Sequence, residues 1–201
     1  MIPLHPIRTR ANIEPLAQAT FARFAAAFPR WDALLPEMER ILRSNASVRS
    51  KLGRFRAIAD DIQAVLAPMT PCRRGCSHCC NIPVIISQAE ADEIGRAIGR
   101  PARQVAVKQE DRETVARRWH GQPCPFLQDN ACSIYAHRPM ACRLHATLDV
   151  DDLMCDLSVP SSESMVPNID LTHFWLCVGI AGGTLRCGDL REFFPGGTHH
   201  G

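Results

Sequence analysis

The chain has 201 residues, enough for one domain or for one domain with an appendage. Hydrophobic residues make up 46% and charged residues 22%, as in ordinary globular proteins, and the net charge of +2 argues against an extended nucleic-acid surface. The longest apolar run, 174–183, has about half the length of a membrane-spanning helix, and no secretory apolar segment is visible near the start. We therefore expect a cytoplasmic protein that binds neither nucleic acid nor membrane.

Residues 1–70 contain no cysteine and have helical periodicity. Apolar residues recur there at spacings of three and four, which predicts three helices, at about 12–28, 31–48 and 52–67. Pro68 and Pro71 then end the helical region. We expect this N-terminal helical segment to pack on the rest of the chain or to bind another protein.

Weaker patterns of secondary structure follow the helical segment. The apolar, β-branched run 82–86 suggests a strand. Ser87 and Glu90 have the spacing of a capping box, which begins a helix that ends near Gly99. Further patterns predict a helix at 102–119, an exposed loop at 161–167 and a buried helix at 169–180.

All ten cysteines lie in residues 71–194, which we expect to form a metal-binding domain that ends before a flexible tail at 195–201. A reducing compartment disfavours structural disulfides, so metal binding is the leading explanation for so many thiols. The alternative is a set of unrelated buried thiols, because free cysteine packs well in a core. That alternative does not explain why four of the ten cysteines fall within residues 72–80.

The first cluster reads Cys72-x3-Cys76-x2-Cys79-Cys80. Thiolates two to four residues apart can bind one metal from a short turn, and Gly75 lets the chain curl. Cys79 and Cys80 are adjacent, so their side chains diverge and are poorly placed for one tetrahedral ion. One of the two therefore binds a second metal, binds a different iron of a cluster, or is a core residue.

A second group of cysteines follows in the segment 124–142, which reads Cys124-Pro-Phe-Leu, Cys132-Ser-Ile-Tyr and Arg138-Pro-x2-Cys142-Arg143. A tight turn at 128–130 would bring Cys132 back toward Cys124. Two arginines, Arg138 and Arg143, either compensate the negative charge of thiolates or pair with surface carboxylates. We expect this segment and the 72–80 cluster to meet at one metal-centred core.

These ordered motifs resemble the YkgJ-type cysteine-cluster family, whose members are described as zinc- or iron-chelating. The resemblance covers about Cys72 to Cys142 and continues more weakly to Cys177, where Val178 replaces the proline of the family's Cys-Pro-Gly segment. It implies zinc or iron as the cofactor, with an iron–sulfur cluster as one form. The implied metal ligands are Cys72, Cys76, Cys79, Cys80, Cys124, Cys132, Cys142 and Cys177.

Seven or eight thiolates exceed the four that one zinc ion takes, which suggests two sites or a polynuclear iron–sulfur centre. Spacing alone does not separate the two metals. Cys155 and Cys187 lie outside the matched motifs, and we interpret them as plain thiols. His78 lies inside the cluster, where a histidine is either a ligand or, more often, an exposed or supporting residue. The terminal pair His199-His200 can bind metal adventitiously.

Three functions fit a mainly α chain with irregular cysteine-rich loops and at most a few short strands. The first is a metal centre that supports the structure or an interaction, because no general base or nucleotide loop is evident. The second is an iron–sulfur enzyme, since the first three cysteines have the radical S-adenosylmethionine spacing and flagellin lysine methylases contain a similar cluster, which would imply methyl transfer to protein lysines. The third is metal storage or delivery through exchangeable thiolates.

Overall fold

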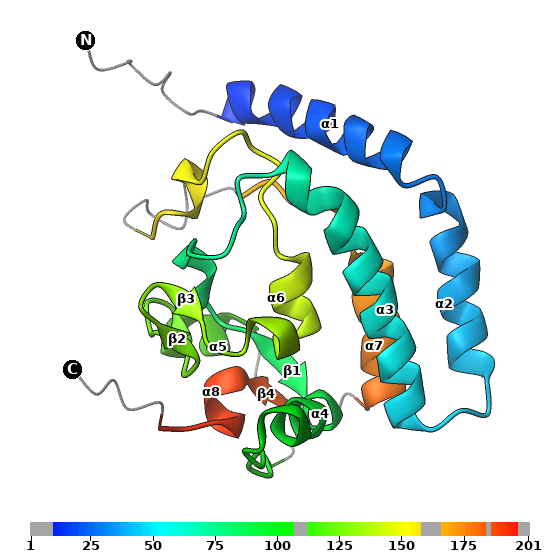
Figure 1. The fold of residues 1–201 in the computed structure, drawn as a ribbon, viewed down its shortest axis with the longest axis vertical. Helices are drawn as coiled ribbons and strands as arrows, with labels where there is room; N and C mark the ends of the chain where they lie inside the picture. Colours follow the sequence, from blue (N-terminus) through cyan, green and yellow to red (C-terminus); the bar gives the residue numbers. More distant parts are fainter. Residues whose placement is uncertain (1–9, 107–111, 158–165, 184–185, 197–201) are drawn as a thin grey trace.

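The computed structural model describes residues 10–106, 112–157, 166–183 and 186–196, and its fold is mainly helical (Figure 1). Short strands occur in two antiparallel pairs within those residues, and the cysteine-rich stretches are mostly irregular. The expected mainly α architecture is therefore confirmed. No helix in the described part of the chain is both long and apolar enough to cross a membrane. The residues outside it include the start of the chain, most of the expected loop at 161–167 and most of the expected tail.

Three helices come first in the described chain: α1 (Arg10–Ala27) crosses the top of Figure 1, α2 (Leu34–Arg43) runs down its right side, and α3 (Val48–Leu66) returns beside α2. Each buries an apolar stripe of the kind that the sequence periodicity predicts. Fully or almost fully buried members of these stripes are Phe24, Ile41 and Phe55. The helices therefore supply half of the buried residues of the larger of two hydrophobic clusters.

The predicted helix at 31–48 ends earlier than expected, and the next helix begins at Val48. α2 ends before Ser44, whose hydroxyl donates to the carbonyl of Ile41, and α3 begins after Ser47, whose hydroxyl accepts from the amide of Ser50. Serine side chains satisfy the unpaired backbone groups at helix ends, so two such residues in close succession end one helix and start the next.

A later helix, α7 (Thr172–Gly182), packs against α2 and α3 and shares the larger hydrophobic cluster with α6 (Met140–Leu144) (Figure 1). The rings of Phe174 and Phe55 meet edge to face with their centroids 5.8 Å apart. The predicted helix at 169–180 is thus present, but only one face is buried. On the other face, the side chains of Leu176 and Ile180 are 60% and 59% exposed.

A smaller hydrophobic cluster forms around α4 (Gln88–Ile98), α8 (Leu190–Phe193) and a two-stranded sheet. The sheet pairs β1 (Ile85–Ser87) with β4 (Cys187–Asp189) in antiparallel register, so two segments far apart in the sequence lie side by side. Ser87 caps α4 by accepting from the amide of Glu90, and Gly99 ends the helix with a φ of 68°, as predicted.

The expected helix at 102–119 is shorter than predicted. In the described residues of this stretch, α5 (Arg112–Trp119) is the helical part, and residues 107–111 lie outside the described chain. The amide of Val105 donates to the side chain of Gln88 at 3.0 Å instead of forming a helical hydrogen bond. Contacts with α4 therefore determine the backbone here.

A tight hairpin joins β2 (Leu127–Gln128) to β3 (Ala131–Cys132). Its turn residues, Asp129 and Asn130, have φ angles of 46° and 57°, as in type I′ turns. This confirms the predicted turn, which places Cys132 opposite Leu127, three residues after Cys124.

Candidate metal centre

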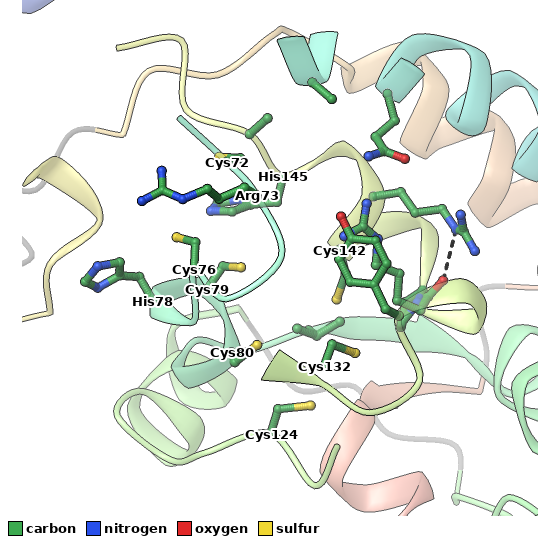
Figure 2. A pocket seen from close by; sticks show the side chains of 18 of the residues that line it. Cys72, Arg73, Cys76, His78, Cys79, Cys80, Cys124, Cys132, Cys142 and His145 are labelled. Carbon is green, nitrogen blue, oxygen red and sulfur yellow. Dashed lines mark hydrogen bonds between the residues drawn. The ribbon is translucent and has the colours of Figure 1, made fainter. Parts of the chain in front are cut away.

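A cavity of about 90 Å³ lies between the two hydrophobic clusters, and cysteine side chains form much of its lining (Figure 2). Leu66 and Ala146 reach it from the larger cluster, and Val84 and Leu190 reach it from the smaller one. The eight cysteines that line it are Cys72, Cys76, Cys79, Cys80, Cys124, Cys132, Cys142 and Cys155. The 72–80 cluster and the 124–142 segment therefore meet at one cavity.

The 72–80 loop presents four of these thiols from a short irregular path. Gly75, with a φ of 97°, turns the chain where other residues would be strained. A 3-10 turn at His78–Asn81 then places Cys79 and Cys80 at the cavity. Both members of the adjacent pair thus face the same space.

Three further thiols, those of Cys124, Cys132 and Cys142, reach the cavity from different elements. The amide of Cys124 donates to the carbonyl of Cys80 at 2.7 Å, which ties the two cysteine segments together. Cys132 belongs to the β2–β3 hairpin, and Cys142 belongs to α6. The site therefore depends on the relative placement of the hairpin, α6 and the cysteine loop.

Glu90 of α4 fixes the start of the helix that carries Cys142. Its buried carboxylate accepts a hydrogen bond from the amide of Met140, the first residue of α6, at 2.8 Å. The predicted capping box is thus only half formed, because the amide of Glu90 binds Ser87 while its carboxylate caps a different helix. Burial raises the pKa of this carboxyl group.

Arg191 of α8 holds the backbone of both cysteine segments from the side of the smaller cluster. Its guanidinium pairs with the buried carboxylate of Asp189 at 2.9 Å. The same group donates to the carbonyls of Cys80, Ile82, Gln122 and Pro123. Cys80 carries one cavity thiol and Pro123 directly precedes another, so one buried cation positions both segments. We call this arrangement the Arg191 clamp.

Burial keeps most of the cavity thiols protonated unless a cation displaces the proton. It raises the pKa of Cys124 to about 11 and that of Cys155 to about 12, and it raises the pKa of Cys142 well above its usual value. Cys79 is the exception, because the hydrogen bond from the Cys80 thiol lowers the pKa of Cys79 to about 7. Metal binding would therefore release protons, and metal affinity should rise with pH.

The two arginines of the 124–142 segment have different roles. Arg143 forms an ion pair with Asp60 of α3, so it links α6 to α3. Arg138 lines the cavity, and its positive charge adds to the hydrogen bond from Cys80 in lowering the pKa of Cys79. Arg143 therefore pairs with a carboxylate, and Arg138 compensates negative charge on a thiolate, so both of the roles expected from the sequence occur.

Comparison with protein-family models identifies the cysteine-rich part of the chain. Residues 71–159 match the model CxxCxxCC, which is described as "Putative zinc- or iron-chelating domain". This segment is a CxxCxxCC domain. It is the cysteine-cluster family that the motifs resemble, and it supports the binding of zinc or iron without specifying which. Comparisons with curated proteins and with solved structures gave no match.

The structure brings seven of the eight predicted ligands to the cavity, and all seven lie within the CxxCxxCC domain. The eighth, Cys177, lies in α7 among the residues of the larger hydrophobic cluster and outside the matched residues. Cys155, which we interpreted as a plain thiol, lines the cavity and lies within the domain, whereas Cys187 lies in β4 and outside the lining. Metal binding by each cysteine stays a prediction.

The chemistry of these residues fits a metal centre, but the thiols are not gathered around one point. Four sulfurs bound to one zinc ion at about 2.3 Å lie about 3.8 Å from one another. Within the residues that the structure describes, one trio of ligand atoms has all separations within 4.8 Å, and it consists of Cys76, His78 and Asp152. The remaining thiols are therefore spread around the cavity.

Proposed function

We propose that the CxxCxxCC domain holds a polynuclear metal centre, in the form of an iron–sulfur cluster, and that this centre stabilises the fold. The observation that carries the proposal is the convergence on one cavity of eight cysteines, from 72–80, from 124–142 and at Cys155. Unrelated buried thiols would be expected to scatter through both hydrophobic clusters. The converging thiols also exceed the four ligands that one ion takes.

The spacing of the thiols favours inorganic bridges between the metal ions. In a zinc–thiolate site, the protein sulfurs surround each ion directly and lie about 3.8 Å apart. In an iron–sulfur cluster, sulfide ions occupy the positions between the irons, and the cysteines bind from outside. Cysteines can then stand farther apart, as they do in the described part of this chain, where no trio of cysteine sulfurs lies within 4.8 Å.

The size of the cavity suits inorganic ions better than an organic cofactor. Its volume of about 90 Å³ is room for several water-sized particles, whereas pockets for drug-sized molecules begin at about 300 Å³. S-adenosylmethionine belongs to that larger size class. The methyl-transfer alternative therefore needs a binding surface beyond this cavity.

A structural role is supported by the position of the cavity between the two hydrophobic clusters. A centre bound by Cys72, beside the larger cluster, and by Cys124, within the smaller one, would cross-link them. Cys124 is only 7% exposed, which suits a resident centre better than exchangeable storage. Partner binding through residues 1–70 and the cytoplasmic location stay predictions.

Metal and sulfide analysis of the full chain, purified without oxygen, tests this proposal. We expect iron, acid-labile sulfide and a visible absorption band in the parent protein, and loss of all three in Cys124→Ser. Cys187→Ser is the matched control and should keep the full iron content, because that residue does not line the cavity. Zinc without sulfide would overturn the iron–sulfur assignment, and equal metal content in the two variants would overturn the site.

A further inference from the structure

Three different ligand types converge at the edge of the thiol-lined cavity. The Sγ atom of Cys76, a ring nitrogen of His78 and a carboxylate oxygen of Asp152 all lie within 4.8 Å of one another. The Nε2 atom of His78 and the Oδ2 atom of Asp152 are 3.5 Å apart. Asp152 belongs to none of the cysteine motifs, so this group extends beyond the ligand set that the sequence indicated.

Two stretches of chain form this group and keep it accessible. Cys76 and His78 belong to the cysteine loop, and Asp152 directly precedes the 3-10 turn that carries Cys155. The side chains of His78 and Asp152 are 37% and 49% exposed. In Figure 2 the ring of His78 points away from the thiols on the far side of the cavity. The group is therefore reachable from solvent and distinct from the deeper thiols.

We propose that Cys76, His78 and Asp152 form a second site, which binds a single borderline divalent cation, Zn²⁺ in the first place. Zinc binds thiolate sulfur, imidazole nitrogen and carboxylate oxygen, at distances of about 2.3, 2.0–2.1 and 2.0–2.2 Å respectively. Around a tetrahedral ion these atoms lie about 3.3–3.6 Å apart, so separations of up to 4.8 Å would need to contract by about 1.2 Å at most. The nitrogen and the carboxylate oxygen, 3.5 Å apart, already have this spacing.

The composition of the group indicates an open site rather than a closed structural one. Three protein ligands leave the fourth tetrahedral position to water or to an incoming ligand. The carboxylate of Asp152 lies within 4.8 Å of the Sγ atom of Cys76, so these two anionic ligands would repel each other without a cation. A divalent cation at this point would relieve the repulsion between these groups. The inference does not depend on the proposed cluster.

A simple histidine–aspartate ion pair is the competing explanation, and cobalt(II) titration of the full chain separates the two. The protein is purified without oxygen in a His199→Ala/His200→Ala background, which removes adventitious binding at the terminus, and its iron and sulfide are measured first. We expect one further equivalent of Co²⁺, with the visible spectrum of a tetrahedral site that has one thiolate ligand. An ion pair alone would bind no added cobalt.

Two variants test the ligands directly. His78→Ala and Asp152→Asn should each weaken the added Co²⁺ binding by at least about 100-fold, since even changes to residues that only support a ligand cost about 10–100-fold. Both should keep the iron and sulfide content of the parent. His173→Ala, which removes an exposed histidine of α7, is the matched control and should bind Co²⁺ as the parent does.

The outcomes are distinguishable from a failure of the proposed cluster. The inference is overturned if the parent binds no added Co²⁺, or if His78→Ala and Asp152→Asn bind it with unchanged affinity. A parent protein without iron or sulfide that still binds one Co²⁺ through His78 and Asp152 would overturn the cluster and support the second site.

Discussion

Replacing Arg191 by methionine tests how the two cysteine segments are positioned. The guanidinium is buried, pairs with the fully buried carboxylate of Asp189 at 2.9 Å, and donates to backbone carbonyls in both segments. Methionine keeps a long flexible apolar side chain but supplies no hydrogen-bond donor. The substitution therefore removes the Arg191 clamp while largely preserving the packing.

The expected loss of stability follows from the ion pair. Removing one partner of a buried pair costs about 3–5 kcal/mol. We expect the lower end, because the carboxylate of Asp189 keeps the backbone amides of Val84 and residue 191 as donors, at 2.7 and 2.9 Å. A loss of about 3 kcal/mol, at a urea slope of about 2 kcal/mol/M, lowers the unfolding midpoint by about 1.5 M.

Urea unfolding followed by circular dichroism, on samples matched for metal content, measures this shift, and metal analysis of the proteins as purified tests the positioning. We expect less bound metal in Arg191→Met, because the carbonyls of Cys80 and Pro123 lose their common donor. Arg96→Met is the control, since Arg96 is exposed and pairs with Glu93 of its own helix, and its effect should stay within about 0.5 kcal/mol. Equal midpoints for the two variants would refute the clamp.

Two further predictions concern Cys155 and Glu90. Cys155→Ser should lower the bound metal per chain more than Cys187→Ser does, because Cys155 lines the cavity, and equal metal contents would contradict a role for it. Glu90→Ala should lose about 1–3 kcal/mol by leaving the amide of Met140 without its acceptor, whereas Glu90→Gln keeps an acceptor oxygen. Burial raises the pKa of Glu90 above its unfolded value, so its stabilising contribution is full below the unfolded pKa and is lost as the pH rises through the folded pKa. The urea midpoint of the parent should therefore fall relative to that of Glu90→Gln as the pH rises, and parallel pH profiles would contradict this account.

Features that depend on neighbouring residues were predictable from the sequence. Ser87 and Gly99 mark the ends of α4, because a helix cap is determined within about one turn. The turn at 128–130 forms because aspartate and asparagine tolerate positive φ angles better than most residues. The ordered cysteine motifs likewise indicated seven of the thiols that line the cavity.

Features that depend on distant parts of the chain were not predictable. The carboxylate of Glu90 caps α6 through Met140, which lies 50 residues away, instead of completing a local capping box. Cys155 and Asp152 stand in no motif, and they meet the cysteine loop only because of the path that the chain takes after α6. An apolar stretch such as that around Leu176 does not reveal which face a helix exposes, because few polar residues mark the solvent side.

X-ray absorption at the metal edge, on the full chain purified without oxygen, tests the central claim most directly. A polynuclear centre places a second metal next to the first, so we predict scattering from a metal neighbour in addition to sulfur ligands. A single zinc ion surrounded by four sulfurs at about 2.3 Å, without a metal neighbour, would contradict the account.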